Sequence, residues 1–154
     1  MTRDRALPGV RETTQAWESL FRAQVTLMRR FQADDVWGEV SLREYDVLFT
    51  LTTCPGGSAR LRELAENSLL TQPSLSRLVE RLEADGLVTR DPVPGDGRGV
   101  AVTLTARGRS VQREVGRRHA ESIRRYVGGA LDADELAALR TLTDKLRAGQ
   151  ADID

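Results

Sequence analysis

The chain has 154 residues, of which 40% are hydrophobic and 30% charged, so it can bury one core and is not a disordered protein. Basic and acidic residues number 23 each, which excludes a global field that attracts nucleic acid and leaves only local clusters of positive charge. One cysteine and one histidine exclude a disulfide framework and a metal site of several Cys and His ligands.

Two helical patterns occupy the first third of the chain. Residues 12–31 place large apolar side chains on one broad side of a helix, and something must cover that side. These side chains are Trp17, Leu20, Phe21, Leu27, Met28 and Phe31. A second apolar helix would begin at Ser41, and the run from Cys54 to Gly57 would end it.

The sequence gives no indication of a membrane protein. No apolar run reaches the length that spans a bilayer, and residues 1–15 lack the apolar core of a secretion signal. We therefore expect a cytoplasmic protein without membrane contact.

The centre of the chain carries a helix-turn-helix pattern. Thr71 would cap a helix over residues 72–82, and Pro73 is tolerated in the first turn because an N–H there has no partner within the helix. Four apolar residues would form the buried stripe of this helix: Leu75, Leu78, Val79 and Leu82. A shorter amphipathic helix over residues 59–67 lies a few residues upstream, as a helix-turn-helix requires. The second helix is thus the predicted reading helix.

A β-hairpin, or wing, is predicted directly after the reading helix. Gly86 would end the helix, residues 87–90 alternate like a strand, and residues 100–104 would form the return strand. The run 92–99 is rich in glycine and proline and is predicted to be the hairpin tip, which places Arg98 at the base of a protruding loop. A cationic loop beside a reading helix suits a phosphate groove.

Two further helices are predicted after the wing. Thr105 would cap a long helix that runs to about Val127, where Gly128-Gly129 stops it. Residues 132–135 have capping-box spacing for a last helix. The apolar stripe of that helix comprises Leu136, Leu139, Leu142 and Leu146. Because apolar helices flank the central module on both sides, we expect them to pack together and to pair with a second copy.

These elements and their motifs resemble the MarR family of bacterial transcription regulators over nearly the whole chain. The wing pattern is the most specific feature, with Asp96 and Arg98 followed by Leu104-Thr105 and then Gly108. The segments SLREYDVL, LRELAENSLLTQPSLSRLVERLEADGLV and LDADELAALRTL are also similar to that family. The wing segment GDGRG departs from the family pattern because it carries more glycine and fewer arginines.

The resemblance implies a mainly α fold with a small β-hairpin wing, in which a winged helix-turn-helix is flanked by N- and C-terminal dimerisation helices. Residues 1–154 would then form a single domain, with the winged helix-turn-helix at about 41–105 and dimerisation helices at about 12–34 and 105–148. A two-fold homodimer would place two reading helices in successive major grooves of double-stranded DNA, roughly 34 Å apart. This predicts an inverted-repeat operator and repression by blocking polymerase.

The first turns of a reading helix point at base edges. Four polar residues there are therefore predicted to contact the groove: Gln72, Ser74, Ser76 and Arg77. Arg81 is predicted to contact a phosphate, and Arg98 to reach the minor groove. Two alternatives stay open: the helix residues merely solvate the outer face, or Arg98 forms an ion pair with Asp96 that stiffens the hairpin.

The resemblance also implies that a small aromatic acid, or another ligand, enters a cleft between the dimer helices and the reading module and releases DNA. The candidate ligand contacts are Trp17, Phe21, Asp46 and Arg90. The two aromatic residues would otherwise be core, and Asp46 would otherwise form a structural ion pair with Arg90 or Arg77. The trio Asp46, Arg77 and Arg90 is similar to the urate-responsive branch of the family, but the additional N-terminal helix of that branch is not matched.

The remaining candidate residues give no indication of catalysis, metal binding or a reactive thiol. Cys54 has no neighbouring Lys or Arg to activate its thiol, and His119 falls on the apolar face of its helix, so an inert thiol and a packed ring are expected. No phosphate-binding motif or nucleophile–base set is present, so we expect no enzyme, no metal site and no cofactor. A winged-helix interaction module without DNA binding remains as the alternative to a DNA-binding regulator.

Overall fold

The computed structural model of the chain describes residues 6–153, so the first five residues of the segment assessed for a secretion signal lie outside the described part. The chain divides into two units, the first ending at Asp34 and the second beginning at Asp35. Between residues 6 and 153, no helix is both long enough and apolar enough to cross a membrane.

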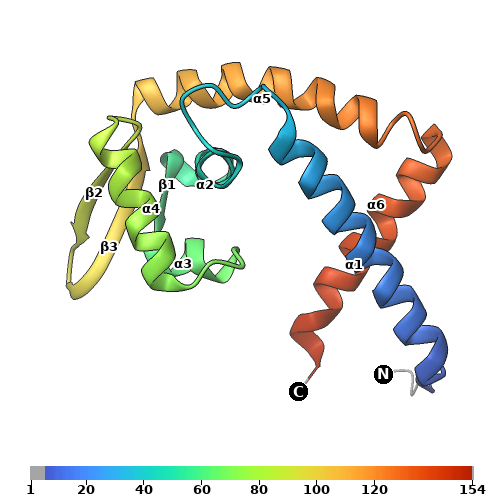
Figure 1. Ribbon diagram of the computed structural model, residues 1–154. Coiled ribbons are helices and arrows are strands. Elements are labelled where there is room, and N and C mark those ends of the chain that lie inside the picture. Colours follow the sequence, from blue (N-terminus) through green and yellow to red (C-terminus); the bar gives the residue numbers. More distant parts are fainter. Residues whose placement is uncertain (1–5, 154) are drawn as a thin grey trace. The chain divides into compact units, whose positions relative to one another are not determined.

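The first unit is built on one helix, α1 (Val10–Ala33), shown in blue in Figure 1. Glu12 in its first turn and Arg30 in its last turn suit the helix dipole. The predicted helix is confirmed and is two residues longer at each end. Trp17 and Phe21 remain 57% and 43% exposed, so this chain alone does not bury them.

The second unit contains all the other described elements, and far more of its residues lie in helices than in its one sheet. In chain order these are α2 (Leu42–Thr52), the 3-10 turn η1 (Pro55–Gly57), β1 (Ser58–Arg60), α3 (Leu61–Glu66), α4 (Gln72–Ala84), β2 (Val88–Val93), β3 (Asp96–Leu104), α5 (Ala106–Tyr126), α6 (Ala133–Ala148) and the 3-10 turn η2 (Gly149–Asp152). The predicted fold class, mainly α with a small β wing, is confirmed.

The three strands form one antiparallel sheet in the order β1, β3, β2. Along β3, Val102 lies opposite Arg90 of β2 and opposite Ala59 of β1, so the central strand joins the wing to the start of the helix-turn-helix. The sequence patterns do not predict β1, because three residues are too few to show a strand alternation.

The predicted hairpin is confirmed, but its tip is much shorter than the predicted run 92–99. The strands continue through Val93 and from Asp96, so the turn contains only Pro94 and Gly95, and Gly95 has a φ of 78° that favours glycine. Gly99 lies within β3, where a Cβ would sit 2.9 Å from the Cβ of Val93. That glycine therefore permits close packing inside the hairpin and does not form a loop.

The core of the second unit lies between the helix-turn-helix, α2 and the sheet. Its fully buried large side chains are Leu48, Leu51, Leu75, Val79, Leu82, Leu87, Val88 and Val102. The four residues of the predicted stripe on α4 are all between 0% and 3% exposed, so the buried face of the reading helix is confirmed. At roughly 25 cal/mol per Å² of apolar surface, burial on this scale is the main force that holds α4 in place.

The start of α5 is fastened to the end of α4 and the start of β2. Thr105 accepts a hydrogen bond from the backbone N–H of Gly108 at 3.0 Å and donates one to the carbonyl of Gly86 at 2.7 Å. Its own N–H donates to the carbonyl of Leu87 at 3.1 Å. A Cβ on Gly108 would overlap that same Leu87 carbonyl oxygen, so only glycine lets the first turn of α5 approach this closely.

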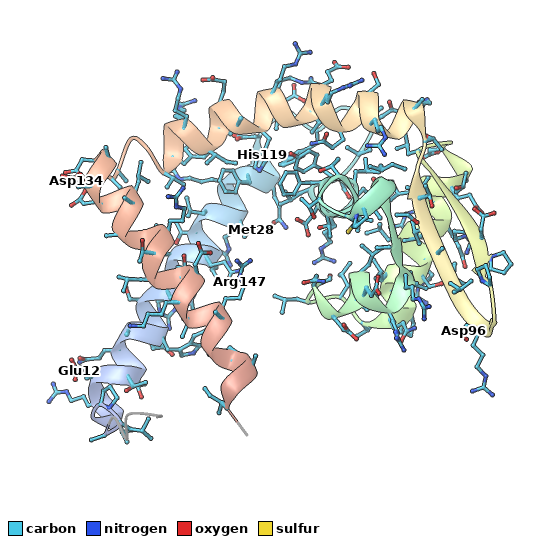
Figure 2. The ribbon with its side chains drawn as sticks, turned by 180° about the vertical axis from the view of Figure 1, so that it is seen from behind. Glu12, Met28, Asp96, His119, Asp134 and Arg147 are labelled. Atoms are coloured by element: carbon cyan, nitrogen blue, oxygen red, sulfur yellow. The ribbon has the colours of Figure 1, made fainter. Side chains whose placement is uncertain are left out.

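The last helix, α6, begins as predicted and leaves its apolar stripe largely uncovered. Asp132 accepts a hydrogen bond from the N–H of Glu135 at 2.9 Å, and the Glu135 carboxylate accepts one from the N–H of Asp132 at 2.9 Å, which completes the predicted capping box. Leu142 and Leu146 are 64% and 52% exposed. Figure 2 labels Asp134 and Arg147 near the two ends of this helix.

Candidate DNA-binding interface

The helix-turn-helix is organised by hydrogen bonds at the start of α4. The Thr71 side chain accepts a hydrogen bond from the N–H of Ser74 at 3.3 Å, which confirms it as the cap, and its hydroxyl lies 3.0 Å from the Ser74 hydroxyl. Pro73 lies in the first turn, as predicted. The first turn of α4 is therefore ordered by its own residues and does not need a ligand to form.

The predicted base-contacting residues of α4 do not all have the same surroundings. Gln72 and Arg77 are exposed, whereas Ser74 and Ser76 are half-buried. The hydroxyl of Ser74 accepts a hydrogen bond from the hydroxyl of Thr71, so it already has a partner within the protein. Arg77 forms no ion pair with any residue between 6 and 153. Gln72 and Arg77 are thus the most accessible members of this predicted set.

Arg81, the predicted phosphate contact, is tied to α2. Its Nε lies 3.4 Å from Oε1 of Glu44, and the Arg81 side chain is still 61% exposed. The other carboxylate oxygen of Glu44 accepts a hydrogen bond from the N–H of Ser41 at 2.9 Å, so Glu44 also caps α2. The pair therefore joins the last turn of α4 to the first turn of α2 and leaves the Arg81 guanidinium accessible.

The wing tip is held by Asp96, but not through the ion pair considered from the sequence. The Asp96 carboxylate pairs with Arg60 on β1 at 3.6 Å and accepts a hydrogen bond from the backbone N–H of Arg98 at 3.2 Å. The alternative of an ion pair between Arg98 and Asp96 is therefore wrong. Figure 2 labels Asp96 at the far end of the wing, so Arg98, two residues further along β3, lies near the tip rather than at the base.

Arg90, a predicted ligand contact, instead joins β2 to α4. Its Nε and Nη2 donate to Oε1 of Glu83 at 3.1 and 3.0 Å, its backbone N–H donates to Oε2 of Glu83 at 2.8 Å, and its Nη1 lies 3.4 Å from Glu80. The hydrogen bonds from Arg90 lower the pKa of Glu83. The hydrogen bonds to Glu83 in turn raise the pKa of Arg90. Glu80 and Glu83 are not among the residues that the sequence analysis singled out. Both are acidic and lie in the C-terminal half of α4.

Asp46 does not join the predicted charge network. Within the described residues it forms no ion pair with Arg77 or Arg90, so the proposed connection of α2 to the reading helix through these three residues is wrong. Although Asp46 is exposed as a residue, neighbouring groups displace enough water from its carboxylate to raise its pKa. The other two predicted ligand contacts, Trp17 and Phe21, lie on α1 with their ring centroids 5.9 Å apart.

Comparison with known proteins agrees with this architecture. A family model described as MarR family matches residues 39–99, from the start of the second unit through most of the wing. The chain is 34% identical over 73 residues to the multiple antibiotic resistance protein MarR of Salmonella typhimurium, a match that covers 47% of this chain and 51% of that protein. The crystal structure of Sco3205, a MarR family transcriptional regulator from Streptomyces coelicolor, in complex with DNA, is similar over 96% of this chain and 92% of that one, with a TM-score of 0.76 and 26% identity.

Residues 39–99 match the MarR family, and the chain as a whole has a fold similar to that of MarR-family regulators. The chain spans about half the length of the curated Salmonella relative that it matches. A second solved relative is the PcaV transcriptional regulator from Streptomyces coelicolor in complex with its natural ligand, which is similar over 95% of this chain and 99% of that one, with a TM-score of 0.65 and 25% identity. The family assignment and the winged-helix fold therefore rest on sequence and on structure together.

An aromatic cluster that sequence reasoning missed joins α2 to α5. Trp37 packs against Tyr45 and His119, with ring centroids 5.6 and 4.8 Å away, and Tyr45 meets His119 edge-on at 5.5 Å. Burial raises the pKa of Tyr45, and a hydrogen bond with Gln112 opposes that shift. The predicted packing of His119 is confirmed. Trp37 was missed because it lies between predicted helices, outside any apolar period.

The lone cysteine, Cys54, lies two residues beyond the end of α2. Its thiol donates to the carbonyl of Thr50 at 3.3 Å, so it is engaged with the last turn of that helix. No group of three or more His, Cys, Asp or Glu side chains among residues 6–153 lies in an arrangement that would hold a metal ion.

Proposed function

We propose that this MarR-family protein is a sequence-specific DNA-binding transcriptional regulator. The observation that carries the proposal is the two-sided character of α4. One side is sealed in the core, while Gln72 and Arg77 face solvent on the other, next to a wing that exposes Arg98. Neither Arg77 nor Arg98 has an ion pair with another described residue, so no carboxylate competes with guanine edges or phosphates for either guanidinium.

We further propose that the protein acts as a homodimer on an inverted repeat and represses by occlusion of polymerase. The support is that α1 and α6 each keep large apolar side chains exposed, among them Trp17 on α1 and Leu142 on α6. Exposed apolar surface of this kind marks interaction sites. A two-fold dimer would present two copies of α4 to successive major grooves, roughly one helical turn or 34 Å apart.

A small aromatic ligand that releases DNA is the third part of the proposal. Its support is the exposed Trp17–Phe21 pair on α1 and the ligand-bound state of the relative PcaV. An aromatic carboxylate has a flat apolar face that such rings can stack on. The test is to titrate a panel of benzoate derivatives into the protein–DNA complex, with cyclohexane carboxylate as the non-aromatic control. Release by the aromatic acids alone is expected, whereas equal release by both classes overturns this part.

The test of DNA binding is selection of duplexes from a randomised library by the purified protein, followed by fluorescence anisotropy of the enriched duplex over a salt series. We expect an enriched inverted repeat and an affinity that falls steeply with salt, because each phosphate contact contributes roughly 0.9 to the slope of log affinity against log salt. Failure to enrich any duplex, together with weak and salt-insensitive binding, overturns the proposal in favour of a winged-helix interaction module. We propose no enzymatic activity.

A further inference from the structure

The contacts of Arg90 connect the two elements that are proposed to touch DNA. Arg90 lies on β2, the first strand of the wing, and its partners Glu80 and Glu83 lie on α4. Glu83 receives three hydrogen bonds from this one residue, two from the guanidinium and one from the backbone N–H, all between 2.8 and 3.1 Å. By comparison, the Arg81–Glu44 pair between α4 and α2 and the Arg60–Asp96 pair between β1 and β3 have distances of 3.4 and 3.6 Å.

A short connection that contains a glycine joins α4 to β2. Gly86 follows the helix with a φ of 74°, and the backbone N–H of Leu87 donates to the carbonyl of Leu82 at 2.9 Å. A glycine in this conformation permits several backbone paths. In this two-pronged contact Nε and Nη2 of Arg90 share Oε1 of Glu83, while the backbone N–H of Arg90 binds Oε2. Because the carboxylate holds both the side chain and the backbone of Arg90, it restricts the direction in which β2 leaves the helix.

We propose that Arg90 and Glu83 are positioning residues for DNA binding, which fix the wing relative to α4 so that Arg98 contacts DNA together with the α4 residues. This proposal rests on the proposed function. Neither side chain needs to touch DNA. The contribution of Arg98 to affinity then depends on the Arg90–Glu83 contact, although Arg98 lies near the opposite end of the hairpin.

Simple electrostatics makes the opposite forecast for Glu83. Removal of a negative charge close to a phosphate-binding surface strengthens DNA binding through reduced repulsion. If Glu83 positions the wing, Glu83→Gln instead weakens binding. The chain offers a matched control two residues away, since Asp85 is exposed at the end of the same helix and forms no ion pair with another described residue. Asp85→Asn removes the same charge without loss of the contact.

The decisive experiment is a double-mutant cycle on the full-length protein, with the duplex enriched from the randomised library as the probe. Arg98→Ala is measured in the parent and in the Glu83→Gln background by fluorescence anisotropy, with binding-competent fractions normalised by stoichiometric titration. We expect Arg98→Ala to weaken binding about tenfold in the parent and about threefold or less after Glu83→Gln, since coupled residues depart from additivity by factors of this order. In the Asp85→Asn background the Arg98→Ala penalty stays at its parental value.

Equal Arg98→Ala penalties in the parent and in the Glu83→Gln background overturn the proposal, because a contact that only stabilised the fold would lower all affinities alike. Stronger DNA binding by Glu83→Gln overturns it as well. Should Glu83→Gln fail to fold, Arg90→Lys replaces it in the cycle, since lysine keeps the positive charge and the backbone N–H but loses the two-pronged contact. If the parent protein enriches no duplex, the proposed function itself is refuted. If the parent binds DNA but the Arg98→Ala penalty is the same in both backgrounds, only the positioning role of Arg90 and Glu83 is refuted.

Discussion

The reading helix α4 and the terminal helix α6 carry similar leucine stripes in opposite surroundings. Leu75 and Leu82 on α4 are fully buried, whereas Leu142 and Leu146 on α6 are 64% and 52% exposed. Both helices have side-chain caps at their first turn. The contrast teaches that apolar periodicity shows which side of a helix needs cover, while only the three-dimensional structure shows whether the chain supplies that cover itself.

The largest effect should come from removal of a buried side chain in α4. We expect Leu75→Ala to lower the free energy of unfolding by about 2–5 kcal/mol, because it leaves a cavity in a core that is already closed. Urea unfolding monitored by circular dichroism measures this. A loss below about 1 kcal/mol would show that α4 is less firmly packed than its burial indicates.

The same leucine-to-alanine exchange on α6 should separate self-association from folding. We expect Leu142→Ala to weaken dimerisation by about tenfold to a hundredfold, the effect of losing one buried leucine at an interface, with little change in far-ultraviolet circular dichroism. Sedimentation velocity over a concentration series gives the dissociation constant. An unchanged sedimentation profile would mean that this part of α6 is not covered by a second copy.

Arginine substitutions on the second unit should have the reverse pattern, with DNA binding changed and self-association retained. We expect Arg77→Ala to cost about 1–3 kcal/mol on the enriched duplex and to relax its sequence preference, because it removes a base-edge contact. Arg98→Ala should weaken selected and scrambled duplexes alike. Anisotropy on both duplexes checks the pair, and identical behaviour of the two variants would contradict the separate roles of α4 and the wing.

The smallest effect is a pH dependence that comes from Glu83. Its pKa is lowered from the ordinary value of 4.5 by the hydrogen bonds from Arg90, so the folded state binds this proton less readily than the unfolded state. At a pH above 4.5 the contact therefore contributes its full stabilisation. This stabilisation is lost as the pH falls through the lower pKa that Glu83 has in the folded state. We expect Glu83→Gln to flatten the fall in urea midpoint below pH 4.5. Glu66→Gln, at an exposed position without an ion pair in residues 6–153, should leave that fall intact.

Features that depend on neighbours along the chain were predictable from the sequence. The Thr71 and Asp132 caps and the α4 stripe each arise within a few residues of one helix, and the structure has all of them. The helix-turn-helix and the wing could be placed for the same reason. Their local signatures follow one another without interruption.

Features that join distant residues were not predictable. Strand β1 is defined by its pairing with β3, more than forty residues later, and the Arg60–Asp96 pair depends on that strand. Arg90 was assigned to Asp46 when its partners are Glu80 and Glu83, because a sequence shows which charges exist but not which of several carboxylates lies within reach. Gly99 was misread for a similar reason, since glycine marks both loops and close contacts.

The contact between Gly108 and Leu87 fixes one end of the long helix α5. With 21 residues, α5 is about 31 Å long, and its first turn is held against the point where α4 ends and β2 begins. A displacement of about 2 Å at the far end of such a rod, which is the size of many helix shifts in regulated proteins, is a rotation of about 4° around that point. The first turn of α5 touches the junction between α4 and the wing, so a rotation about that point would reach both proposed DNA-contacting elements at once.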